Sequence, residues 1–173
     1  MVVLKKKLDS NFKTDPLISK MINLLMREGK KEKAEKFLHK IFCFIEENYP
    51  GEALNILYLA VFHTQLSIGV RLKAQGKKYR RNINIKNIFI PYFLSDTRGQ
   101  TLAIRSLFVS GKNRSLSRPL WQNLSEEFLE AAFNKGNVVE KRYETHKIAK
   151  NSRRLYPSLW IRKYNENSSN YSI

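Results

Sequence analysis

Acidic residues are scarce in this sequence. Its 173 residues include 15 Asp and Glu against 32 Lys and Arg, which gives a formal net charge of +17 and a pI of about 10.1. No Asp or Glu occurs between Glu52 and Asp96. This excess of positive charge is larger than solubility requires. It favours a polyanionic partner, with nucleic acid first and an anionic membrane surface second.

The residue types that build enzyme and metal sites are also few. Cys43 is the only cysteine, so an internal disulfide is excluded, and no Cys/His spacing indicates zinc. The three histidines have no Ser/Asp or Cys context that suggests a catalytic arrangement, and the chain lacks a glycine-rich phosphate loop. We therefore predict no enzyme activity, no cofactor and no metal site.

Long apolar runs are missing as well. The uncharged stretch 53–70 comes nearest, but Asn, His, Thr, Gln, Ser and Gly interrupt it, which indicates a buried helix that runs into a strand. The first twelve residues carry lysines without an apolar core, so no signal peptide is predicted. We accordingly expect no membrane partner.

Apolar residues at helical spacing predict a mainly α fold with six helices. Asp15-Pro16 is a helix start, because Asp accepts hydrogen bonds from uncapped amides and Pro suits the first helical position. Gly29 and Gly111 are interpreted as helix ends. The predicted ranges are 15–29, 30–47, 52–63, 97–110, 119–135 and 137–153.

A β-hairpin is predicted between the third and fourth helices, at about residues 66–86. Ile68, Val70 and Leu72 alternate on its first strand, Ile83 and Ile85 alternate on its second, and a glycine is available for the turn. The strands and tip carry seven cations: Arg71, Lys73, Lys77, Lys78, Arg80, Arg81 and Lys86. Such a hairpin would repel itself unless a polyanion neutralised it; the alternative is a solvated hairpin whose charges protect an exposed edge.

The hairpin is expected to protrude from a single domain of residues 14–160, preceded by a basic arm, 1–13, and followed by a tail, 161–173. Residues 87–94 are expected to form an apolar loop or irregular strand, because a proline cannot occupy a central strand.

Basic residues outside the hairpin gather at helix starts and along helix faces. Lys30 and Lys31 lie at a predicted helix N-terminus, which favours phosphate. Arg98 and Arg105 are two turns apart on the fourth helix, and a loop extends this line with Lys112, Arg114 and Arg118. The sixth helix carries Lys141, Arg142, Lys147 and Lys150. Candidates for stacking on bases are Tyr79, Tyr92 and Trp160; for Tyr92, packing in the core or at its rim is an equal alternative.

Four blocks in the chain resemble the small-subunit ribosomal protein S-seven family, of the bacterial and organellar type. The blocks are Lys20–Met26 with Gly29-Lys30-Lys31, Val70-Arg71 with Tyr79, Arg98–Arg105, and Ala131-Ala132 through Lys141-Arg142 and His146 to Asn151. The resemblance covers about residues 20–160. It implies a helical domain with a hairpin between the third and fourth helices.

The resemblance also implies a structural role in the head of the small ribosomal subunit. The protein would bind the 3′ major domain of the rRNA, support head assembly and line the exit-site tRNA and mRNA channel, beside proteins of the S-nine, S-nineteen and S-eleven types. The rRNA-binding candidates are Lys30, Lys31, Arg71, Lys73, Arg98, Arg105, Lys112, Arg114, Lys141, Arg142, His146 and Lys147. The candidates near exit-site tRNA and mRNA are Lys77, Lys78, Tyr79, Arg80 and Arg81.

Several departures from the family pattern bear on the compartment. The turn has Gly76 where the family usually has two glycines, residues 87–94 look like an insertion, and Ser106 replaces an expected Trp. Abundant Asn, Lys, Ile and Tyr are typical of A+T-rich organellar genomes. We therefore predict a mitochondrial ribosome, with a plastid or the bacterial cytoplasm as alternatives.

Two other functions remain open from the sequence. One is a DNA-binding or nucleoid-packaging protein that places the basic ribbon in a groove. The other is a peripheral membrane protein that uses apolar residues 87–94 and the flanking cations.

Overall fold

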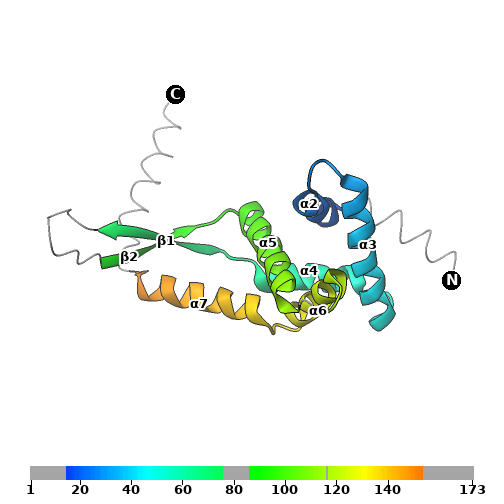
Figure 1. Cartoon of the computed structure of the whole chain (residues 1–173). Coiled ribbons are helices and arrows are strands. Elements are labelled where there is room, and N and C mark those ends of the chain that lie inside the picture. Colours follow the sequence, from blue (N-terminus) through cyan, green and yellow to red (C-terminus); the bar gives the residue numbers. More distant parts are fainter. Residues whose placement is uncertain (1–14, 76–85, 116, 154–173) are drawn as a thin grey trace, which may run out of the picture. The chain divides into compact units, whose positions relative to one another are not determined.

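The computed structural model describes residues 15–75, 86–115 and 117–153, with the backbone alone for 73–75 and 86–88. The described part contains six helices and an antiparallel pair of strands between the third and the fourth, so the predicted mainly α class is confirmed (Figure 1). The elements are α2 (Pro16–Leu25), α3 (Lys31–Asn48), α4 (Ala53–Thr64), β1 (Ile68–Gln75), β2 (Lys86–Phe93), α5 (Asp96–Arg114), α6 (Leu120–Ala132) and α7 (Asn137–Asn151).

The chain divides into two compact units. One consists of Met1–Gln65 and Gln100–Glu140, and the other of Leu66–Gly99 and Lys141–Ile173. The first unit therefore holds α2, α3, α4, α6 and most of α5, and the second holds the β-ribbon and most of α7. The predicted single domain of residues 14–160 remains a prediction.

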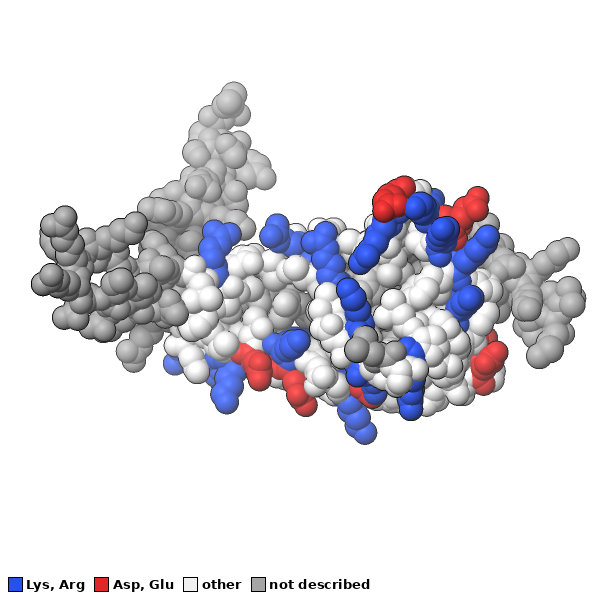
Figure 2. All heavy atoms as spheres, viewed as in Figure 1, with Lys and Arg blue, Asp and Glu red and all other residues white. Residues whose placement is uncertain are grey.

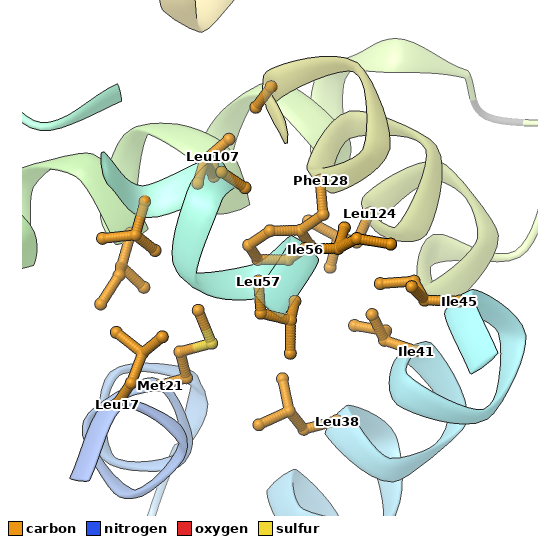
Figure 3. Packing of buried hydrophobic residues seen from close by; sticks show 14 of the residues in the cluster. Leu17, Met21, Leu38, Ile41, Ile45, Ile56, Leu57, Leu107, Leu124 and Phe128 are labelled. Carbon is orange, nitrogen blue, oxygen red and sulfur yellow. The ribbon is translucent and has the colours of Figure 1, made fainter. Parts of the chain in front are cut away.

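The first unit is built around one hydrophobic core. Leucine, isoleucine, methionine and phenylalanine side chains from five helices point toward one another there (Figure 3). Met21 from α2, Leu38 from α3, Leu57 from α4, Leu107 from α5 and Phe128 from α6 are each at most 1% exposed. Burial of this apolar surface, at about 25 cal/mol per Å², is the main stabilising contribution to the unit.

The start of α2 is where the sequence predicts it, whereas its end is not. Asp15 Oδ1 accepts hydrogen bonds from the amides of Leu17 (2.8 Å) and Ile18 (3.3 Å), as expected of an N-cap. The helix ends at Leu25, before Gly29, so the prediction that Gly29 caps it is wrong. Gly29 has φ +71° and belongs instead to the turn that leads into α3.

The prediction that Gly111 ends the fourth helix is also wrong. Gly111 lies inside α5, is buried, and faces α6. A Cβ atom placed on it would lie 2.4 Å from Leu124 Cδ2 and 3.2 Å from the Leu124 Cα. The glycine therefore allows the backbone of α5 to approach α6 closely.

The strands of the ribbon pair from Ile68 opposite Phe93 to Gln75 opposite Lys86. Residues 87–93 therefore belong to a regularly paired strand, so of the expected loop or irregular strand the loop is wrong. Pro91 pairs with Val70 and is tolerated because each strand of a two-stranded ribbon has an outer edge, where a missing amide hydrogen costs no ladder bond. The predicted strand positions Ile83 and Ile85 and the turn at Gly76 lie outside the described residues.

Candidate nucleic-acid interface

The turn between α2 and α3 presents two lysines at an uncapped helix start. Lys30 is the N-cap residue of α3, and no side chain caps the first turn. Both lysines are exposed; Lys30 pairs with Glu28, and the Nζ of Lys31 lies 3.9 Å from Glu35 Oε1. Exposed pairs of this kind contribute at most about 1 kcal/mol, so a phosphate can replace the carboxylates. The predicted anion-binding character of this turn therefore has a local structural basis.

α5 exposes three cations at intervals of seven residues. Arg98, Arg105 and Lys112 are exposed, whereas Ile104 and Leu107, on the opposite side of the helix, are fully buried. Seven residues make nearly two turns, so successive cations lie about 10 Å apart along one helix face. None of the three forms an ion pair with a described residue. The face can therefore offer its full charge to an RNA backbone.

Arg114 differs from these three because carboxylates already surround its guanidinium. It pairs with Glu126 (3.4 Å), Glu127 (3.3 Å) and Glu130. Hydrogen bonding to Glu130 raises the pKa of Arg114, and nearby carboxylates add to this rise, whereas burial opposes it. The Glu127 side chain is only 5% exposed, so the cluster reaches the edge of the core. The predicted rRNA contact of Arg114 remains a prediction, but its charge is compensated within the protein.

The same cluster holds the loop between α5 and α6. Arg118 donates a hydrogen bond of 2.8 Å to Glu126, and Asn123 Nδ2 donates one of 2.6 Å to the carbonyl of Ser115. Arg114 and Arg118 thus bracket the loop and link it to α6. The sequence predicts that Arg114 and Arg118 continue the line of cations on α5. It does not predict their carboxylate partners, because these lie on the following helix, α6.

α7 carries the remaining predicted cations. Lys141 and Lys147 are exposed, and Arg142 is half-buried, with its guanidinium carbon 6.0 Å from the ring centre of Tyr143. His146 is also half-buried, and burial, followed by the charge of Arg142, lowers its pKa below 6.5. In the protein alone, burial and Arg142 thus favour the neutral form of His146, which can hydrogen-bond to RNA.

On the ribbon, an arginine lies over an aromatic ring. The guanidinium carbon of Arg71 is 5.3 Å from the ring centre of Tyr92. Tyr92 is paired with Gly69, where a Cβ would lie 2.6 Å from the ring, so the glycine makes room for it. Sequence reasoning missed Gly69, although an isolated glycine in an alternating strand is a signal of close approach. The guanidinium held over the ring can in turn contact a phosphate or stack on a base.

The other ribbon candidates are described only in part. Lys73 pairs with Ile88 in the ladder, and its side chain lies outside the described atoms. Lys77, Lys78, Tyr79, Arg80 and Arg81 fall outside the described residues, as does Trp160. Lys and Arg side chains outnumber Asp and Glu over much of the face seen in Figure 2.

In the described part of the chain, the His, Cys, Asp and Glu side chains form no group of three or more that could hold a metal ion. Among the described helices, none has the length and apolar character needed to cross a membrane.

A family model and several known proteins that match this chain all point to the same family. The family model described as ribosomal protein S7p/S5e matches residues 2–153. The small ribosomal subunit protein uS7 of Orientia tsutsugamushi (strain Boryong) is 33% identical over 134 residues, which cover 77% of this chain and 72% of the relative. The uS7 protein of Beijerinckia indica is 31% identical over 146 residues, covering 84% and 88%. That of Azorhizobium caulinodans is 30% identical over 144 residues, covering 83% and 86%.

Proposed function

The chain belongs to the ribosomal protein S7p/S5e family, and from this premise we propose that it binds rRNA as a structural, non-enzymatic component of the small ribosomal subunit. Its role is to hold folded RNA in place. The net charge of +17 and the exposed cations on three helices support this role.

The observation that carries the proposal is the row of Arg98, Arg105 and Lys112 on α5. These cations share one exposed helix face and have no described carboxylate partner. A row of this kind, about 20 Å long, can contact several phosphates of a folded RNA, whose shape rather than base sequence then sets the fit. Within the first unit, Lys30 and Lys31 at the start of α3 are further proposed contacts, and in the second unit Lys141 and Lys147 on α7 are proposed contacts of their own.

The finer assignment concerns the place in the subunit. We propose the head, with binding to the 3′ major domain of the rRNA, a role in head assembly, and neighbours of the S-nine, S-nineteen and S-eleven types. The ribbon would reach toward exit-site tRNA and mRNA with Lys77, Lys78, Tyr79, Arg80 and Arg81. The resemblance of the sequence blocks supports this assignment, as does the cation–aromatic contact of Arg71 with Tyr92 on the ribbon.

The compartment is part of the same proposal. The relatives cited above are bacterial, so the ribosome is that of a bacterium or an organelle. The enrichment in Asn, Lys, Ile and Tyr supports a mitochondrial one. Fractionation of the source cells tests this, because the chain would sediment with mitochondrial small subunits rather than with those of another compartment.

The binding proposal is tested by Arg105→Glu in the full chain, with Lys135→Glu as a control of equal charge change at an exposed position outside the proposed surface. Affinity for a head-domain rRNA fragment should fall by more than about 1 kcal/mol, and the salt dependence of binding should weaken. The control should change affinity by much less. Equal effects of the two variants would contradict the α5 row as the contact. Preference for duplex DNA over folded rRNA in competition would instead favour the DNA-binding alternative.

A further inference from the structure

α4 is apolar on both of its long faces. The inward face, which includes Ile56, Leu57, Ala60 and Val61, is buried in the core. The outward face, here called the outer stripe, is formed by Asn55, Tyr58, Leu59 and Phe62. These four positions follow the spacing i, i+3, i+4, i+7, which places them on one side of a helix.

The outer stripe exposes large apolar side chains. Tyr58 is 40% exposed, Leu59 46% and Phe62 68%. A helix that is apolar on most sides is normally buried on most sides, and apolar anchors at helical spacing are the pattern by which a helix face docks a partner. Tyr58, Leu59 and Phe62 supply three such anchors, whereas Asn55 is polar. Among the described residues, none covers the stripe to the extent that its composition calls for.

The charges next to the stripe identify the kind of partner. α4 carries no Lys or Arg, although the chain has 32 of them. Its N-cap residue, Glu52, is exposed, and the Tyr58 hydroxyl donates to both carboxylate oxygens of Asp15, at 3.0 and 3.1 Å. Phosphate is disfavoured on a surface with carboxylates at its edge and no cation on the helix. An apolar segment that also carries Lys or Arg complements both features.

We propose that the outer stripe of α4 binds a second protein of the small subunit, through a segment with apolar anchors and neighbouring positive charge. Phe62 and Leu59 are the central contacts, and Asp15 and Glu52 attract the cations of the partner. The inference rests on the proposed function, because it takes the chain to be part of the subunit. It adds a surface that faces protein rather than RNA.

The test places a photo-crosslinking amino acid at position 62 in the full chain and isolates small subunits that contain it. A second chain carries the same group at position 105, on the proposed RNA-binding face. We expect position 62 to crosslink to another ribosomal protein, in a peptide with Lys or Arg beside apolar residues, and position 105 to crosslink to rRNA.

The outcomes separate the two proposals. A chain that is absent from small subunits overturns the proposed function and the inference with it. A chain that is present, but whose position 62 crosslinks to rRNA, to its own first fourteen residues, to a second copy or to nothing, overturns the inference alone. Liposome flotation of the isolated chain through Phe62 would also overturn it in favour of a membrane.

Substitutions then measure the contact. Phe62→Asp and Leu59→Asp should each lower the occupancy of the crosslinked protein in salt-washed subunits by about tenfold. They should change the affinity of the isolated chain for an rRNA fragment by less than about twofold, since no RNA contact is removed. Leu120→Asp is the matched control, because Leu120 is 42% exposed and lies on α6. Unchanged occupancy in both α4 variants, or equal loss in the control, would contradict the proposal.

Discussion

Gly69 lies directly beneath the ring of Tyr92, and no side chain larger than hydrogen fits between them. A Cβ at position 69 would lie 2.6 Å from Tyr92 Cζ and 2.8 Å from its hydroxyl oxygen. The same ring lies 5.3 Å from the guanidinium carbon of Arg71. One glycine thus sets the position of the aromatic side chain that an arginine of the proposed RNA-binding surface contacts.

We expect Gly69→Ala to weaken rRNA binding while leaving the stability of the protein nearly unchanged. The atoms in the way are the far end of a tyrosine side chain, which can move, and alanine is better than glycine in a strand by about 0.5–1 kcal/mol. The free energy of unfolding should therefore change by less than about 1 kcal/mol, while the displaced ring weakens rRNA binding. Denaturant titration and fragment binding measure the two quantities. In a Tyr92→Leu background the added alanine should have no further effect on binding; an undiminished effect there would show that the ring is not the cause.

Gly111→Ala, unlike Gly69→Ala, should lower the stability of the protein. Alanine would normally stabilise a helix interior by about 1 kcal/mol relative to glycine. Here the new methyl group would meet the Leu124 side chain at 2.4 Å and its backbone Cα at 3.2 Å, in a buried contact between α5 and α6. Overpacking costs about 1–3 kcal/mol and should outweigh the gain in helix propensity. Thermal or denaturant unfolding of Gly111→Ala measures the net loss. Ser110→Ala, one residue away on the same helix, is the control, and an equal change in both variants would contradict the packing argument.

These two glycines also show where sequence reasoning reached its limit. The Asp15 cap and the start of α3 depend on neighbours within a few residues, and the sequence predicts both. The roles of Gly69 and Gly111 depend on Tyr92 and Leu124, which are 23 and 13 residues away. Glycine spacing alone cannot distinguish close packing from a helix end.

At the candidate interface, too, the sequence predicts features that depend on near neighbours but not those that depend on another helix or strand. The row of Arg98 and Arg105 follows from helical spacing, since charged residues face solvent when the opposite face is apolar. The carboxylate partners of Arg114 come from α6, so its compensated charge required the tertiary structure. The sequence predicts a two-stranded hairpin but expects a loop or irregular strand at residues 87–94, because Pro91 argues against a central strand; only the pairing shows that β2 extends through these residues to Phe93.

Arg114→Gln should lower stability more than it lowers RNA affinity. The substitution removes the positive charge from three carboxylates and leaves Glu127, 5% exposed, without its ion pair. A buried unpaired carboxylate costs several kcal/mol at most, but the Arg114 side chain is 30% exposed and water screens the cluster, so we expect a loss of about 1–2 kcal/mol. Equilibrium unfolding measures it.

Binding of the folded Arg114→Gln variant to an rRNA fragment distinguishes a stabilising role of Arg114 from a role in RNA contact. Arg105→Glu should weaken binding with little effect on unfolding, and Arg114→Gln should do the reverse. If Arg114→Gln reduces affinity as much as a change on the α5 row while the protein remains fully folded, Arg114 contacts RNA in spite of its carboxylate partners.

His146 should make stability depend on pH in a defined direction. Burial, and then the positive charge of Arg142, lower its pKa in the folded protein below the ordinary value of 6.5. Between the two pKa values the unfolded chain binds more protons than the folded one, so stability is fully present above about pH 6.5 and falls as pH drops toward the folded-state pKa. Unfolding of the wild type and of His146→Gln at pH 7.5 and pH 5 measures this effect. Glutamine removes the titrating group, so the wild type should lose more stability than the variant on acidification. The same loss in both proteins would assign the pH dependence to other groups.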